Sequence, residues 1–129
     1  MLHFAPPVIA APAVRIAALD DAQERARLAA WIEAHPSATA FHRLAWGEAV
    51  AKGTGHQMLA LVAEDPANSI TGYLPLHVVH SPLFGRAIVS AGFAVDGGIL
   101  ADDAVIAAVL ADAAWLQCER HSAPTLELR

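Results

Sequence analysis

The chain has 129 residues, enough for one domain that buries about two-thirds of the surface its unfolded chain exposes. Hydrophobic residues make up 56% of it, but charged residues and histidines interrupt every apolar run before it reaches the ~20 residues of a membrane-spanning helix. Thirteen acidic and eight basic residues give a net charge of −5, without a basic cluster to neutralise the phosphates of a duplex. We therefore expect a soluble, cytoplasmic protein without a transmembrane segment. We do not expect it to bind DNA.

The cysteine and histidine content argues against disulfide and metal chemistry. Cys118 is the only cysteine, so no internal disulfide can form, and no CxxC or Cys/His ladder indicates a zinc site. His77 and His80 lie three residues apart on a predicted strand, which directs them to opposite faces. We expect no bound metal.

The chain begins with a segment that we expect to be irregular. Residues 1–12 contain three prolines and no basic region of a signal peptide, so we interpret them as a loose leader. Residues 13–129 are expected to form a single domain. Its first element is a strand, which the partly alternating segment 14–19 predicts.

Two helices follow the first strand. Residues 21–34 predict an amphipathic helix, which Asp20-Asp21 can cap at its start and for which Glu24 can complete a capping box. Residues 43–52 predict a second helix that glycines, including Gly55, can end.

The second half of the chain is richer in strand signals. Apolar runs at 58–63 and 70–79, separated by turn-forming residues, predict an antiparallel hairpin. A short strand at 87–90, a helix from about 104 to 121 and a strand at 126–129 complete the prediction. The order is β-α-α-β-β-β-α-β, which indicates an α/β (α+β) mixed sheet flanked by helices on both faces.

Five ordered motifs carry a resemblance to a known family. The segment HPSATAFHRLAW at 35–46 is followed by GYLPL at 72–76, SPLFG at 81–85, VSAGFAVDGG at 89–98 and LELR at 126–129. Together they resemble the FemAB-related acyltransferases associated with PEP-CTERM and exopolysaccharide systems. Within the fourth motif, this chain has glycine where the family has proline and aspartate where it has an aromatic residue.

The resemblance implies a GNAT-like fold and the N-terminal half of a tandem protein. That half would bind the acceptor in acyl transfer to a cell-wall or exopolysaccharide precursor, a small-molecule or lipid-linked sugar or peptide. The family normally continues into a second GNAT-like domain, which would use an aminoacyl-tRNA or acyl-CoA donor, so no cofactor is expected in this half and its catalytic residues are unknown. The acceptor-binding candidates that the motifs supply are Phe41, His42, Arg43, Trp46, Phe84, Arg86 and Phe93.

Other interpretations of the same residues remain open. His42 and Arg43 could hold an anionic acceptor or could simply cap and solvate a helix end. Trp46 and Trp115 stand at helical spacing from apolar neighbours, which favours core packing. The strand at 126–129 could pair with a homodimer partner or another chain in a stand-alone interaction domain.

The chain could also be a small acetyl-CoA-dependent N-acetyltransferase. Such enzymes hold the coenzyme A pyrophosphate at a Q/R-x-x-G-x-G/A turn. The nearest glycine pair, Gly97-Gly98, lacks this pattern.

Overall fold

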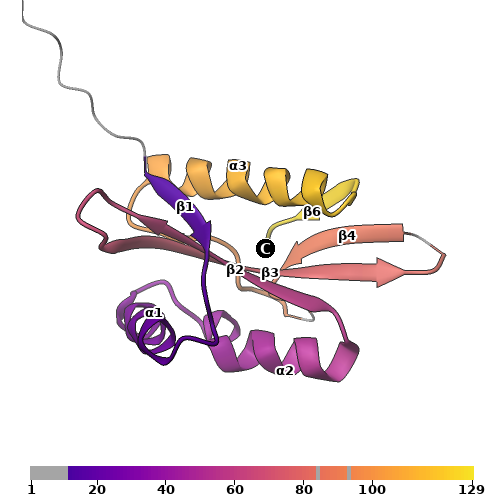
Figure 1. The fold of residues 1–129 in the computed structure, drawn as a ribbon, viewed down its shortest axis with the longest axis horizontal. Helices are drawn as coiled ribbons and strands as arrows, with labels where there is room; N and C mark the ends of the chain where they lie inside the picture. Colours follow the sequence, from indigo (N-terminus) through magenta and orange to yellow (C-terminus); the bar gives the residue numbers. More distant parts are fainter. Residues whose placement is uncertain (1–11, 84, 93) are drawn as a thin grey trace, which may run out of the picture.

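A mixed sheet with helices on both faces organises the chain in a computed structural model, which describes residues 12–83, 85–92 and 94–129 (Figure 1). The sheet has six strands in the order β1-β2-β3-β4-β6, and β5 pairs with β3. Among the strand pairs in the described part of the chain, β4–β6 alone is parallel. The elements are β1 (Ala13–Ile16), α1 (Ala22–Ala34), the 3₁₀ turn η1 (Ala40–His42), α2 (Leu44–Thr54), β2 (Gln57–Glu64), β3 (Ile70–Ser81), β4 (Gly85–Ser90), β5 (Leu100–Ala101), α3 (Ala104–Arg120) and β6 (Thr125–Glu127).

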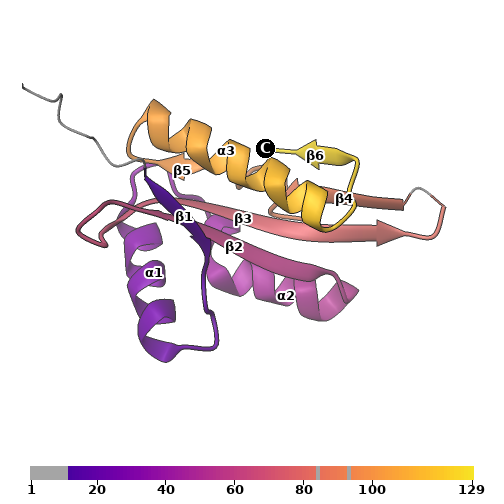
Figure 2. The same ribbon diagram turned by 45° about the horizontal axis from the view of Figure 1, so that its top comes forward.

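The predicted α/β class and the order of the main elements are confirmed. Helix α3 covers one face of the sheet, and α1 and α2 cover the other (Figures 1 and 2). Alternate residues of β2 serve the two sides, because successive side chains of a strand point to opposite faces. Leu59 and Leu61 join the core under α3, whereas Ala60 and Val62 join the core under α1 and α2.

Helix α1 begins at the predicted aspartate, but its cap differs from the expectation. Asp21 accepts a hydrogen bond from the backbone N–H of Gln23 at 2.9 Å. Glu24 does not complete the capping box: its carboxylate accepts the backbone N–H of Ala18 and pairs with Arg15 on β1. A charge-assisted bond to a guanidinium is stronger than one to a backbone amide. Glu24 therefore pairs with Arg15 instead of completing the capping box.

Arg15 also belongs to a cluster of ion pairs that joins β1, β2 and α1. The guanidinium donates from Nε to Glu64 Oε1 at 2.5 Å, and Arg27 donates from Nη2 to Glu64 Oε2 at 2.8 Å. These bonds, that from Arg15 first, hold the pKa of the Glu64 carboxyl below its usual value of 4.5. The pKa of Glu24 is lowered by its bond from Arg15.

Helix α3 contradicts the expected burial of Trp115. Its buried residues include Ile106, Leu110, Ala114 and Cys118, four residues apart in each case, which places them on one face. Trp115 follows Ala114 and turns out of this face, and it is 52% exposed. Because alanines lie on both sides of the helix, the sequence pattern did not distinguish its buried face from its exposed face.

Within the described residues, no helix is long and apolar enough to cross a membrane. The same part of the chain contains no group of three His, Cys, Asp or Glu side chains that could hold a metal ion.

Candidate functional site

The sheet is interrupted where β4 would continue along β3. Ser90, the last residue of β4, pairs with Leu76, and Leu100, the first of β5, pairs with Tyr73. Only two residues of β3 lie between these partners, whereas residues 91–99 separate the two strands. Strand β5 is therefore the continuation of β4 on the same edge of β3, and the described residues between them, 91–92 and 94–99, named here the excursion, leave the sheet.

Pro75 in the centre of β3 explains where the interruption falls. Its carbonyl accepts the N–H of Ala91 at 3.0 Å, so it points toward β4. The N–H and C=O of one strand residue point to the same side, so the N–H that proline lacks would also have faced β4. Proline is tolerated inside a sheet where the ladder is already broken. A proline within the apolar run at 70–79 is thus the sequence signal of the excursion.

His77 fastens the start of the excursion to α2. The side chain is fully buried on β3, its Nδ1 accepts the N–H of Gly92 at 2.8 Å, and its Nε2 lies 2.9 Å from the carbonyl of Gly47 on α2. These partners require a neutral ring with its proton on Nε2. Burial lowers the pKa of His77, which favours this form.

His42 fastens the far end of the excursion in the same way. Its Nδ1 accepts the N–H of Thr39 at 2.9 Å, which completes a capping box over η1, and its Nε2 lies 3.0 Å from the carbonyl of Gly98. Burial lowers the pKa of His42, although the hydrogen bond to the Gly98 carbonyl and the charge of Asp96 oppose this shift. The ring is therefore also a neutral donor at Nε2.

Trp46 helps His77 to hold the start of the excursion, and Arg129 holds its middle. The indole N–H of Trp46 donates to the carbonyl of Gly92 at 3.2 Å, and its ring meets that of Phe41 edge to face at 4.9 Å. The guanidinium of Arg129 donates to the carbonyl of Ala94 at 2.8 Å. The excursion is thus a fixed part of the domain.

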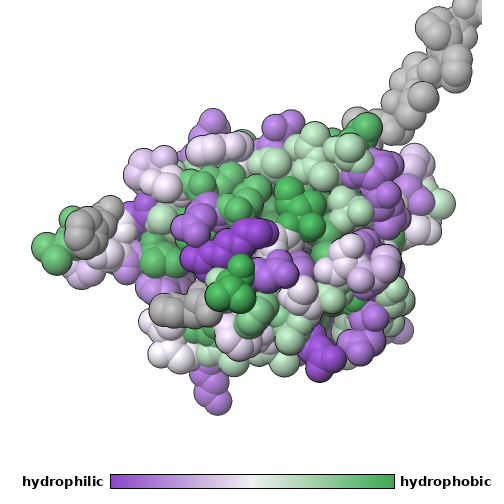
Figure 3. All heavy atoms as spheres, turned by 180° about the vertical axis from the view of Figure 1, so that it is seen from behind, coloured by the Kyte–Doolittle hydropathy of each residue, from purple (hydrophilic) through white to green (hydrophobic). Residues whose placement is uncertain are grey.

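The view from behind shows apolar side chains exposed toward the middle of that face (Figure 3).

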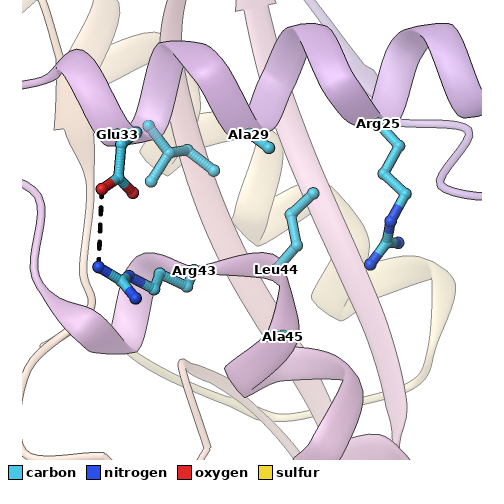
Figure 4. Close-up of a pocket in the computed structure, with 7 residues that line it drawn as sticks. Arg25, Ala29, Glu33, Arg43, Leu44 and Ala45 are labelled. Carbon is cyan, nitrogen blue, oxygen red and sulfur yellow. Dashed lines mark ion pairs between the residues drawn. The ribbon is translucent and has the colours of Figure 1, made fainter.

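A groove of about 260 Å³ lies between α1 and the start of α2 (Figure 4). Ile32 and Leu44 are buried overall, but parts of their side chains form apolar surface in the lining of the groove. Tyr73 packs in the same core cluster, and its buried hydroxyl has no hydrogen-bond partner among the described residues. The lining residues are Arg25, Ala29, Ile32, Glu33, Arg43, Leu44 and Ala45.

Arg43 stands between this groove and a smaller one of about 140 Å³ that also includes Ile32 and Glu33. Its guanidinium approaches the Glu33 carboxylate at 3.6 Å, and the two side chains are 62% and 70% exposed. Arg43 is also the N-cap of α2 and makes no capping hydrogen bond through its side chain. By contrast, Arg25 forms a two-pronged ion pair with Glu48 of α2.

The N-terminus of α3 has the opposite electrostatic character. The Asp103 carboxylate accepts the N–H of Ile106 at 2.9 Å and so caps the helix. Asp102 precedes it, and both side chains are exposed. An anion at this helix start would meet two carboxylates, and one of the amides that could bind it is already occupied.

The structure brings four of the predicted acceptor-binding residues together at the entry to α2. They are Phe41, His42, Arg43 and Trp46, of which Arg43 is exposed and His42 is buried. Arg86 lies apart on β4, where its guanidinium donates to the carbonyl of His121 at 3.0 Å. The two remaining candidates, Phe84 and Phe93, lie outside the described residues. An acceptor-binding role for this set stays a prediction.

The arrangement of strands and helices matches the expected GNAT-like fold and is similar to that of solved structures. A ribosomal-protein-alanine N-acetyltransferase from Brucella melitensis biovar Abortus 2308 superposes with a TM-score of 0.63 at 22% identity, over 93% of this chain and 80% of that one. A tetramutant of the BH1408 protein from Bacillus halodurans gives 0.58 at 18% identity, over 91% and 81%. Another mutant of BH1408 gives 0.56 at 20% identity, over 91% and 81%.

These likenesses show the fold. No protein-family model matches the sequence, and no curated protein matches it at a significant level. The sequence motifs predict a role for the residues at the entry to α2 but none for His77 and Arg129, two residues that fix the excursion. The position of His77 within the apolar run at 70–79 is a signal of burial, but its hydrogen-bond partners are distant in sequence.

Proposed function

We propose that this chain is a GNAT-type acyltransferase domain that binds the acceptor of an N-acyl transfer. In this proposal the chain is the N-terminal half of a FemAB-like protein that acts on a cell-wall or exopolysaccharide precursor. A second GNAT-like domain, or a homodimer partner, would supply the donor site. The GNAT fold and the five sequence motifs support this proposal.

The observation that carries the proposal is the acidic, self-capped start of α3. Coenzyme A-dependent enzymes of this fold need free backbone N–H groups and little negative charge where the pyrophosphate binds. Here Asp103 occupies the N–H of Ile106 and Asp102 adds a second carboxylate. Both charges oppose pyrophosphate binding, which favours an acceptor role over a donor role.

The chemistry of the proposed reaction explains why an acceptor domain is useful. A C–N bond forms between the acceptor amine and the acyl carbon, the bond from that carbon to the donor oxygen or sulfur breaks, and the amine loses a proton. Holding the amine at the acyl carbon replaces a bimolecular encounter with a unimolecular step. A rigid wall such as the anchored excursion suits this positioning task.

A second candidate is an acetyl-CoA-dependent N-acetyltransferase of small size. Its support is the likeness to the ribosomal-protein-alanine N-acetyltransferase, of which this chain covers 80%. Acetyl-CoA binding distinguishes the two candidates, since the acceptor domain needs no donor site of its own.

A melting experiment with acceptors tests the proposed function. A UDP-linked peptidoglycan precursor and simple sugar nucleotides are added separately to the chain. A ligand present at 100 times its dissociation constant should stabilise the fold by about 2.7 kcal/mol. Stabilisation by the precursor supports the acceptor role. If neither the precursor nor any sugar nucleotide raises the melting temperature, this acceptor role is wrong.

A further inference from the structure

We propose that the groove between α1 and α2 binds a carboxylate carried on a small apolar body, with Arg43 as the anion-binding residue. The inference deepens the proposed function and rests on it only for the ligand's role as acceptor. The expected ligand is an N-acylated apolar amino acid or the carboxylate end of a short peptide.

The size and lining of the groove indicate the size and the apolar character of the part of the ligand that carries the carboxylate. Its volume of about 260 Å³ lies just below the 300–1,000 Å³ typical of sites for drug-sized molecules, so it suits one or two amino acid residues. Ile32 and Leu44 provide apolar surface, and Ala29 and Ala45 leave room for an apolar side chain. Figure 4 shows Arg43 and Glu33 beside one end of this surface and Arg25 near the other.

The state of Arg43 sets the charge of the ligand. Its contact with Glu33 at 3.6 Å is exposed, and exposed pairs of this kind contribute little to stability. An incoming carboxylate can therefore displace Glu33 at little cost. Arg25 is held by two bonds to Glu48, which leaves Arg43 as the more available guanidinium of the groove.

The start of α2 adds to this preference for an anion. Arg43 gives α2 no side-chain cap, and the next two residues, Leu44 and Ala45, line the groove. The partial positive charge of a helix N-terminus favours a carboxylate within the first turn. A guanidinium and an uncapped helix start thus complement the same ligand group.

Three probes separate the two features of the ligand. N-acetyl-leucine carries both the apolar body and the carboxylate, N-acetyl-leucinamide lacks the charge, and acetate lacks the body. Binding is followed by backbone NMR shifts of the full chain at millimolar concentrations. We expect N-acetyl-leucine to shift the amides of Arg43, Leu44 and Ala45 with saturation, and both other probes to bind at least several-fold more weakly.

Two charge variants give effects of opposite sign. Arg43→Gln removes a charged hydrogen bond, which should weaken N-acetyl-leucine binding by about tenfold or more. Glu33→Gln removes the competing carboxylate and should tighten binding by a few-fold. The matched control is Arg120→Gln on α3, on the opposite face of the sheet, which should leave affinity unchanged. A folding defect would not move the first two affinities in opposite directions.

Several outcomes would overturn the inference. These are no saturable shift in the groove with N-acetyl-leucine, equal binding of N-acetyl-leucinamide, or unchanged affinity in Arg43→Gln. Saturable binding of N-acetyl-leucine with no melting shift from the precursor or any sugar nucleotide would leave the groove assignment standing while the proposed function falls.

Discussion

Single residues in this domain explain how an irregular segment becomes rigid. His42 and His77 each use both ring nitrogens, one as acceptor and one as donor, to tie the excursion to η1, β3 and α2. A neutral imidazole offers this pair of roles in one side chain. The predicted binding residue His42 therefore has a clear structural task, whereas Arg43 beside it is exposed and pairs with Glu33 at 3.6 Å.

His77 provides the direct test of this anchoring. Replacing it with Leu leaves the buried N–H of Gly92 without a partner, at about 1–3 kcal/mol, and removes one of the hydrogen bonds that the helical carbonyl of Gly47 accepts. The control is His80→Leu on the same strand, where the side chain is exposed. Urea denaturation should show a large loss for His77→Leu and little for His80→Leu. Equal losses would contradict the anchoring role.

Among the elements, α3 and β3 approach each other closely at Gly72. A Cβ added there would lie 2.7 Å from Ile106 Cγ2 and 2.8 Å from Leu110 Cδ1, which is closer than van der Waals contact allows. The helix rests on the strand because no side chain stands between them. The glycine thus sets the distance between α3 and the sheet.

Gly72→Ala should push α3 away and destabilise the fold by about 1–3 kcal/mol, the usual cost of overpacking. Gly53→Ala in α2 is the matched control, because nothing lies within 4 Å of its added Cβ. Alanine in a helix is about 1 kcal/mol better than glycine, so this variant should be stabilised. Thermal unfolding of both variants measures the difference, and a stabilised Gly72→Ala would refute the packing argument.

The elements differ in how far the sequence predicts them. Helix α1, helix α2 and the β2–β3 hairpin follow from apolar spacing, caps and turn residues, which are local signals. The split of one strand into β4 and β5 does not, because it depends on pairing with β3 at a distance in sequence. Pro75 is a local feature of the sequence that indicates this split. Of the site, the sequence supplied the residues at the entry to α2, but the groove beside Arg43 depends on how α1 and α2 are placed.

At the scale of the whole molecule, the shifted pKa values predict an acid-sensitive fold. The pKa values of His42 and His77 lie below 6.5, and those of Glu24 and Glu64 below 4.5, in the folded chain. In both pH ranges the unfolded chain binds more protons, so stability is lost as the pH falls.

The free energy of unfolding from urea titrations should be level between about pH 7 and about pH 8. It should decline below pH 6.5 as the histidines of the unfolded chain protonate, and decline again below pH 4.5 with the glutamates. Glu64→Gln should weaken the second decline and leave the first. Greater stability at pH 5 than at pH 7 would contradict this account.

The measurement that tests the central claim most directly is a calorimetric titration of the chain with acetyl-CoA. The carboxylates of Asp102 and Asp103 at the start of α3 lead us to expect no saturable binding, as befits an acceptor domain. Saturable binding of acetyl-CoA would contradict that claim and would identify the chain as an N-acetyltransferase with its own donor site.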